Sequence, residues 1–139
     1  MDYQDPIGKY ALKVPSQWTQ LPGPIPGTSE LVLHDADGTT PAARLRPTCD
    51  YVDVPLAVTV GDRLRDEPHL QHRCGGWQGM DTCLLEERST ATAAAAPLQW
   101  EWLAHDTAHG LNIRLMFELF DHTQKAEALA IIRSVRPAK

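Results

Sequence analysis

The chain of 139 residues is long enough for one domain with its own core, and its net charge of −5 comes from 18 acidic and 13 basic residues. Because it has no basic run, it lacks the clustered Lys and Arg that phosphate contacts need, so nucleic-acid binding is not expected. No apolar run approaches the length of a membrane span, and residues 1–6 contain neither the basic nor the apolar region of a signal peptide. We therefore expect no membrane association and a cytoplasmic location, or a periplasmic one if a leader was removed.

The N-terminal third predicts strands separated by turns. Residues 1–8 are expected to form a loose arm, and the alternation of polar and apolar residues over 9–14 then predicts a first strand. The segment 21–29 is rich in proline and glycine and predicts a loop. Residues 30–34 and 42–48 predict a pair of antiparallel strands joined by a turn.

A helix is predicted after Pro55, a residue that suits the first helical turn, and before Pro68, which ends it. Leu56, Val60 and Leu64 recur every four residues, which places them on one side of this helix. That side is expected to pack on the core, and the acidic residues of the same segment are expected on the solvent side.

The segment 69–87 predicts a second hairpin whose centre can be located. If Gln78-Gly79 are the two turn residues, Cys74 and Cys83 lie directly opposite each other on adjacent strands. Opposite residues of this kind can form a disulfide when their Cα atoms lie within about 7 Å. We therefore expect a possible disulfide between Cys74 and Cys83.

The cysteines are expected to be structural. The chain has no Cys-x-x-Cys motif, which argues against a redox pair, and Cys49 is expected to be a small core residue rather than a nucleophile. In a cytosolic protein the pair Cys74 and Cys83 could remain reduced although the geometry permits a bond.

The C-terminal segment predicts a third hairpin followed by a helix. Residues 98–104 and 111–119 alternate between apolar and polar side chains around a turn at His105–Gly110. Asp121 can cap a helix whose apolar face consists of positions 128, 131, 132 and 135, and Pro137 ends it. A helix that buries one stripe, after strands that bury one face, predicts an α+β fold in which helices flank an antiparallel sheet.

Several stretches resemble the Mog1/PsbP-like superfamily in element order and in local sequence. They are the opening strand, proline and tryptophan of Tyr10–Trp18, the hairpin residues Trp77–Gly79 and Leu84–Glu86, the strand Leu111–Phe120 and the closing residues Ala126–Pro137. Members of this superfamily include an extrinsic subunit of the photosynthetic oxygen-evolving complex, a nuclear-import factor that binds a small GTPase, and bacterial adaptor or immunity proteins of type VI secretion. The resemblance implies a single domain over residues 1–139, an α/β/α sandwich and a non-enzymatic role in protein binding.

A metal- or small-ligand-binding protein is the alternative from another class. His69, His72, Cys74 and Cys83 lie near one hairpin and could offer nitrogen and sulfur ligands to zinc. Exposed histidines in strands and turns are the commoner case, so neither a metal nor a cofactor is expected. The chain also has no Gly-x-Ser-x-Gly elbow and no phosphate-binding glycine loop, and the adjacent carboxylates Glu86-Glu87 point to opposite faces of a strand. No enzymatic activity is therefore expected.

Contacts with a partner protein are expected at the hairpin tips and on the acidic helix face. Trp77 is either exposed at its hairpin tip, where it could anchor an interface, or folded back on the sheet. The predicted contact residues are Trp77, Gln78, Met80, His105, Asp106, His109, Asp62, Asp66 and Glu67. We expect the partner to be a secreted bacterial toxin that this chain neutralises as an immunity protein. An adaptor or chaperone of a secretion effector is the alternative, and the oligomeric state stays open.

Overall fold

The structure is a computed structural model that describes residues 2–4, 10–23, 28–34, 38, 41–50, 54–87, 98–120 and 122–137. Its elements in chain order are β1 (Asp2–Gln4), β2 (Tyr10–Lys13), β3 (Trp18–Pro22), β4 (Ser29–His34), β5 (Pro41–Asp50), α1 (Leu56–Asp66), β6 (Gln71–Trp77), β7 (Met80–Glu87), β8 (Leu98–Asp106), β9 (Leu111–Leu119), the 3₁₀ turn η1 (His122–Gln124), α2 (Lys125–Arg133) and β10 (Arg136–Pro137). Neither of the two helices in this part of the chain is long and apolar enough to cross a membrane.

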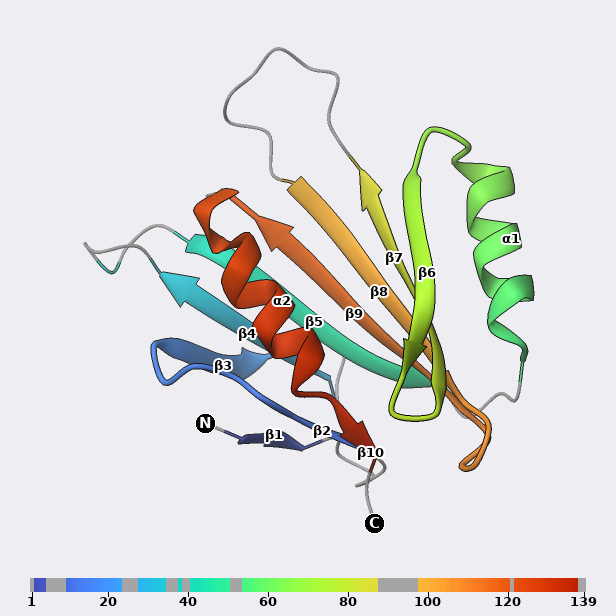
Figure 1. Cartoon of the computed structure of the whole chain (residues 1–139). Coiled ribbons are helices and arrows are strands. Elements are labelled where there is room, and N and C mark those ends of the chain that lie inside the picture. Colours follow the sequence, from blue (N-terminus) through green and yellow to red (C-terminus); the bar gives the residue numbers. More distant parts are fainter. Residues whose placement is uncertain are drawn as a thin grey trace.

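Two antiparallel sheets organise the described residues (Figure 1). The larger has seven strands in the order β3-β4-β5-β9-β8-β7-β6, and the smaller has three in the order β1-β2-β10. In the larger sheet every strand pairs antiparallel with its neighbours. The antiparallel sheet and the strand pairs predicted around the three turns are therefore confirmed.

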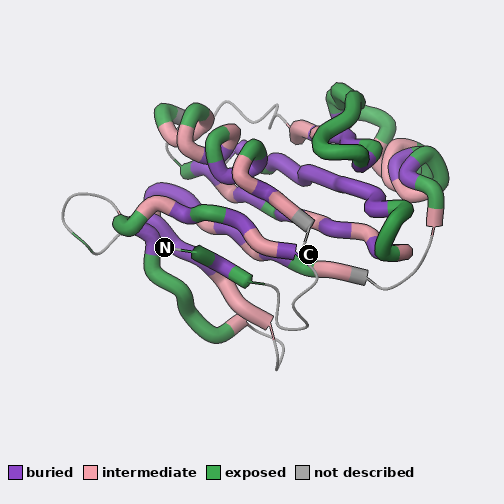
Figure 2. Tube along the Cα trace, turned by 60° about the horizontal axis from the view of Figure 1, so that its bottom comes forward, coloured by how far each residue is buried: buried purple, intermediate pink, exposed green. Residues whose placement is uncertain are grey.

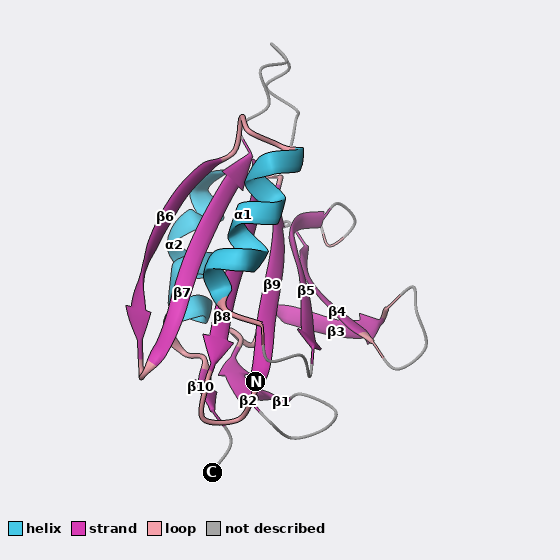
Figure 3. Cartoon of the chain, turned by 90° about the vertical axis from the view of Figure 1, so that its right-hand side faces the viewer, coloured by secondary structure: helices cyan, strands magenta, loops and turns pink. Residues whose placement is uncertain are grey.

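The two helices cover opposite faces of the large sheet, which gives the α/β/α arrangement. In Figure 3, α1 lies in front of the strands and α2 behind them. Ala128 and Ile131 of α2 belong to the main core together with Trp102 of β8. Val60 of α1 packs in a second cluster with Leu103, the neighbour of Trp102 on the same strand. Because successive strand residues point to opposite faces, the two helices must lie on opposite sides.

The buried residues lie mainly on the central strands, as the purple segments in Figure 2 show. On β9 every second residue from Leu111 to Leu119 is buried, and these residues belong to the core on the α2 side. The alternating pattern that predicted this strand therefore reports its buried face correctly.

The central hairpin has the predicted register. Trp77 pairs with Met80 around the turn Gln78-Gly79, and Cys74 pairs with Cys83. The Cα atoms of these cysteines are 4.0 Å apart and the two are joined by a disulfide. Gln78 and Gly79 have φ values of 50° and 80°, in the left-handed region that a two-residue hairpin turn requires. The predicted opposition of Cys74 and Cys83 within bonding distance is confirmed, and the disulfide that the sequence left possible is formed.

Residues 2–4 differ from the prediction of a loose arm over residues 1–8, whose remaining residues lie outside the described part. Residues Asp2–Gln4 form β1, in which Tyr3 is 3% exposed and pairs with Leu12 of β2. Three residues are too few to show the periodic pattern that predicts a strand. One buried aromatic side chain can nevertheless hold this end of the chain on the core. The loop predicted over residues 21–29 is also shorter, because β3 extends to Pro22 and β4 begins at Ser29, while residues 24–27 lie outside the described part.

The C-terminal helix is shorter than predicted at both ends. It begins at Lys125 after η1, and the proposed cap Asp121 lies outside the described residues. It ends at Arg133 rather than at Pro137, because the hydroxyl of Ser134 donates to the carbonyl of Ile131 over 2.6 Å and its oxygen accepts from the amide of Lys13 over 2.8 Å. The chain then leaves the helix, and β10 pairs with β2.

Candidate binding face

Among the described residues, the face of the large sheet that carries α1 is only partly covered by that helix. α1 packs against β7 and β8, and β9 and β5 continue this face beyond the helix (Figure 3). The register places Arg44 of β5, Glu118 of β9, Gln99 of β8 and Glu87 of β7 in one row across the sheet. This row alternates with the buried residues on the α2 side, so its polar side chains point away from the main core.

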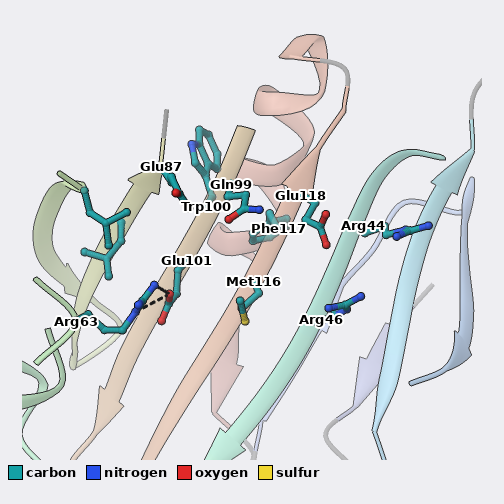
Figure 4. Close-up of a pocket in the computed structure, with 12 residues that line it drawn as sticks. Arg44, Arg46, Arg63, Glu87, Gln99, Trp100, Glu101, Met116, Phe117 and Glu118 are labelled. Atoms are coloured by element: carbon teal, nitrogen blue, oxygen red, sulfur yellow. Dashed lines mark hydrogen bonds and ion pairs between the residues drawn. The ribbon is translucent and has the colours of Figure 1, made fainter. Parts of the chain in front are cut away.

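The next row contains Arg46, Met116, Glu101 and Leu85. The two rows line a hollow of about 190 Å³, to which Arg63 of α1 contributes from the side (Figure 4). Met116 is 38% exposed, although a methionine in a strand usually packs inward. The hollow therefore combines an accessible apolar side chain with charges of both signs. We call these two rows together with Arg63 the open face.

Glu101 is the most buried charged residue of the open face, with 7% of its side chain exposed. Two guanidinium groups approach it from different elements. Arg63 Nη2 of α1 lies 2.9 Å from its Oε2, and Arg114 Nε of β9 lies 2.9 Å from its Oε1. Both carboxylate oxygens are thus engaged in ion pairs, so Glu101 serves as an electrostatic link between helix and sheet rather than as a free acid or base.

Arg63 extends this link to the end of its own helix. Its Nη1 donates to Glu67 Oε1 over 2.7 Å. The hydrogen bond with Glu67, together with the charge and hydrogen bonds of Glu101, raises the pKa of Arg63 above its ordinary value although partial burial opposes this shift. The same hydrogen bond from Arg63 lowers the pKa of Glu67. The ion pairs therefore stabilise the charged forms on both sides.

The far side of the open face carries a second group of ion pairs. Glu30 of β4 lies 3.4 Å from Arg44 Nε and 3.9 Å from Arg46 Nη2. The guanidinium carbon of Arg44 also lies 5.6 Å above the ring centre of Phe120, an exposed residue just after β9. The arginines are thus held in position while their side chains stay 36% and 42% exposed.

The predicted contact residues around the central hairpin have different fates. Trp77 is 37% exposed and its indole nitrogen donates to the carbonyl of Val135 over 3.4 Å, so it lies between the two predicted positions. Gln78 is exposed at the turn. Met80, by contrast, is 2% exposed and packs in the main core, so its assignment to a contact surface is wrong. Successive side chains of a strand point to opposite faces, and the side chain of Met80, the first residue after the turn, points to the face of the main core.

The turn predicted at His105–Gly110 begins later than expected. His105 and Asp106 belong to β8 and are 7% and 4% exposed, so neither can meet a partner at the surface. Asp106 Oδ2 lies 2.6 Å from Nδ1 of His109 and so holds the turn that follows. His109 itself is exposed. The polar residues His105 and Asp106 suggested that the turn begins at His105. The strand β8 continues through both of them because a buried aspartate is stable when it is hydrogen-bonded.

Of the acidic residues predicted for contact, Asp62 and Asp66 lie in the C-terminal half of α1 and Glu67 follows the helix directly. Asp62 is exposed and pairs with Arg65 over 3.3 Å, and Asp66 is exposed as well. Glu67 is the member of this group that connects to the open face, through Arg63. Contact of these residues with a partner stays a prediction.

The metal site proposed for His69, His72, Cys74 and Cys83 is not formed. Because Cys74 and Cys83 share a disulfide, their sulfurs are not thiolate ligands. Among the described residues a different group brings ligand atoms together, namely Glu67, His69 and Glu87, whose atoms lie within 4.8 Å of one another. The Arg63 guanidinium already occupies one oxygen of Glu67, which disfavours a second cation there.

Sequence reasoning missed the residues of the open face. Arg44 and Arg46 alternate along β5, as Arg114, Met116 and Glu118 do along β9. Alternation predicts that these side chains leave the core, but it cannot show that α1 folds beside them and turns an exposed face into a hollow. The useful clue in the sequence was Met116, an apolar residue among the polar positions of its strand.

This architecture is an α+β fold with a PsbP-like arrangement. The solution structure of cyanobacterial PsbP (CyanoP) from Synechocystis is similar with a TM-score of 0.68 and 17% identity, and the alignment covers 99% of this chain and 91% of that one. A crystal structure of a Bacteroides thetaiotaomicron protein is similar with a TM-score of 0.72 and 12% identity over 99% of this chain, which spans about half (48%) of that protein. No protein-family model and no curated protein sequence matches the chain. At these identities the likeness shows the fold alone.

Proposed function

We propose that this chain is a non-enzymatic module that binds another protein through the open face. The observation that carries the proposal is the exposure of Met116 between the Arg46 and Glu101 positions of the neighbouring strands. An apolar centre surrounded by oriented charges is the usual composition of a protein interface, in which a few central side chains supply most of the affinity.

Within this class we propose that the chain is an immunity protein that binds and neutralises a secreted bacterial toxin. A role as the adaptor of a secretion effector is the alternative. The net charge of −5 supports a partner with a basic surface, because complementary charge accelerates and orients association. The PsbP-like fold is compatible with this role and does not distinguish it from others.

We also propose an oxidising compartment such as the periplasm as the place of action. The disulfide Cys74–Cys83 supports this location, because disulfides persist outside the reducing cytosol. Thiol labelling of the protein directly in lysed native cells tests it. Protection of both cysteines until a reductant is added is the expected result, and immediate labelling of both would contradict it.

Affinity capture from native-host cells tests the binding role. The variant Met116→Asp places a charge at the centre of the open face, whereas Arg133→Glu changes an exposed charge on α2, on the other side of the sheet. We expect the same partner with the wild type and Arg133→Glu, and at least about a tenfold loss with Met116→Asp, since central interface residues contribute over about 1 kcal/mol. Equal capture by both variants would remove the open face as the site, and absence of any partner would contradict the function.

A further inference from the structure

The strand β6 is an exposed edge of the large sheet in the part of the chain that the structure describes. It is the last strand in the sheet order, and all seven of its residues are exposed, so that β6 is green throughout in Figure 2. Native edge strands are usually protected by proline, charged side chains, a bulge or a covering element, because a free edge can pair with another chain. The opposite edge strand, β3, ends in Pro22, whereas β6 contains no proline and has Arg73 as its one Lys or Arg. Its register with β7 also runs without a shift, so no bulge twists the edge away.

The hairpin geometry decides which backbone groups of β6 face outward. The turn residues Gln78-Gly79 have the positive φ values of a type I′ turn, in which the flanking pair is hydrogen-bonded across the hairpin. Here that pair is Trp77 and Met80. Because backbone groups alternate in direction along an antiparallel strand, every second residue counted back from Trp77 faces β7 and the residues between them face away.

The outward residues are therefore His72, Cys74 and Gly76. The 4.0 Å separation of the Cα atoms of Cys74 and Cys83 supports this phase, since pairs without hydrogen bonds across a hairpin lie closer than hydrogen-bonded ones. The disulfide at the middle of β6 also holds this strand against β7. The outer edge is thus a fixed row of backbone donors and acceptors.

We propose that β6 pairs antiparallel with β6 of a second copy of this chain, in a register centred on Cys74. This register pairs the whole strand Gln71–Trp77 with its counterpart, and it sets outward-facing residues opposite one another so that their N–H and C=O groups can all bond. His72 then lies opposite Gly76 of the second copy, and Arg73 opposite Gly75. A two-residue offset in one direction would instead set Arg73 against Arg73, two like charges, and the offset in the other direction would pair only residues 73–77 of β6.

The bulk of the side chains fits this register. Around Gly75 no atom lies within 4 Å of the position of a Cβ, so the space beside it is open for a long side chain such as Arg73 of the second copy. Trp77 would lie opposite Gln71 of the second copy, which lines a hollow of about 270 Å³ together with Leu84, Trp100 and Leu129. Trp77 is the one exposed tryptophan of the four, all of which lie in the described residues. It would supply an aromatic anchor at each end of the pairing.

One strand pair is a small interface. Stable complexes bury about 1,200–2,000 Å² in total, so we expect a reversible dimer with a dissociation constant in roughly the micromolar range. Sedimentation velocity of the oxidised wild type, from about 1 µM to about 1 mM, should show a shift from monomer to dimer. A protein that remains monomeric over this range would overturn the proposal. Any strand that pairs with β6 would then have to come from a different protein.

Proline variants test the edge itself. His72→Pro and Gly76→Pro each remove one outward N–H and leave the bonds to β7 intact, so the hairpin and its disulfide should persist. We expect each to weaken dimerisation at least about tenfold, since paired backbone groups are lost. The control Gly61→Ala changes a glycine of α1, outside β6, with no atom within 4 Å of its Cβ position, and should dimerise within about threefold of the wild type. A dimer of full strength in both proline variants would overturn the proposal.

Hydrogen exchange of the wild type tests the same point without relying on a variant that folds. The amides of His72, Cys74 and Gly76 should become protected as the concentration rises, whereas those of Arg73 and Gly75 should be protected by β7 at every concentration. Concentration-independent exchange at the three outward amides would contradict the pairing. Because the dimer uses the sheet edge and not the open face, its presence or absence is separate from the capture of a partner.

Discussion

At the scale of single residues, the open face depends on one buried carboxylate. Glu101 lies in the middle of β8, where sequence alternation with Trp100 and Trp102 predicts only that its side chain leaves the main core. Its low exposure arises because α1 brings Arg63 over it while β9 supplies Arg114. A charge so placed is stable only while its partners remain.

Replacing Arg63 by alanine should therefore destabilise the fold. Glu101 would keep Arg114 and lose a hydrogen-bonded guanidinium, so we expect a loss of about 1–3 kcal/mol in the free energy of unfolding, measured by urea denaturation. Arg65→Ala is the matched control on the same helix, because its pair with Asp62 is largely exposed and should contribute within about 0.5 kcal/mol. Equal effects of the two substitutions would show that the Glu101 link contributes no more than a surface pair.

Glu67 should give the fold a measurable dependence on acid. Its pKa is lowered in the folded protein below the ordinary value of 4.5, first by the hydrogen bond from Arg63. A group with a lowered folded pKa contributes stability that is present above its unfolded pKa and is lost as the pH falls through the folded pKa. The contribution should thus disappear below the ordinary range of glutamate.

Thermal unfolding of Glu67→Gln checks this sign. Between about pH 7 and about pH 3 the melting temperature of the variant should fall less than that of the wild type, because the variant has no carboxylate to protonate at this position. Asp62→Asn provides the comparison for an exposed acidic residue on the same helix. A variant whose melting temperature falls as steeply as that of the wild type would contradict the role of Glu67.

At the scale of elements, the hairpin β6–β7 was the most accurate prediction. Gln78-Gly79 determines both the turn and the register, so the opposition of Cys74 and Cys83 follows from local chemistry alone. The closing helix was less accurate, because its end depends on Ser134 bonding to Lys13, a residue far away in the sequence.

Loss of the disulfide should destabilise the protein by an amount set by its loop. Cys74 and Cys83 are nine residues apart, and closing a loop of that length corresponds to about 2–3 kcal/mol in the chain-entropy model. Urea denaturation with and without a thiol reductant measures it. The double variant Cys74→Ala and Cys83→Ala is the control and should not respond to the reductant. A wild type with the same stability in both conditions would contradict a structural role for the bond.

At the scale of the whole molecule, the two helices on opposite faces of the large sheet determine which parts of the sheet surface are covered and which are exposed. α2 closes the main core, whereas α1 packs mainly against β7 and β8 on the other side (Figure 3). The uneven cover leaves the open face beside α1 and the edge at β6. Both surfaces arise from the size of the sheet relative to its helices, and neither belongs to a single segment of sequence.

The sequence by itself determined the strands β2, β4, β5, β8 and β9, the helix α1 and the opposition of Cys74 and Cys83, because period, turn chemistry and pairing are local properties. Only the tertiary structure decided that Tyr3 is a core residue, that Met80, His105 and Asp106 are buried, and that Arg63 reaches Glu101. These outcomes depend on which side chains meet across segments distant in the chain. A local pattern shows which face of a strand leaves the core, but the packing of another element decides whether that face meets solvent, a helix or a partner.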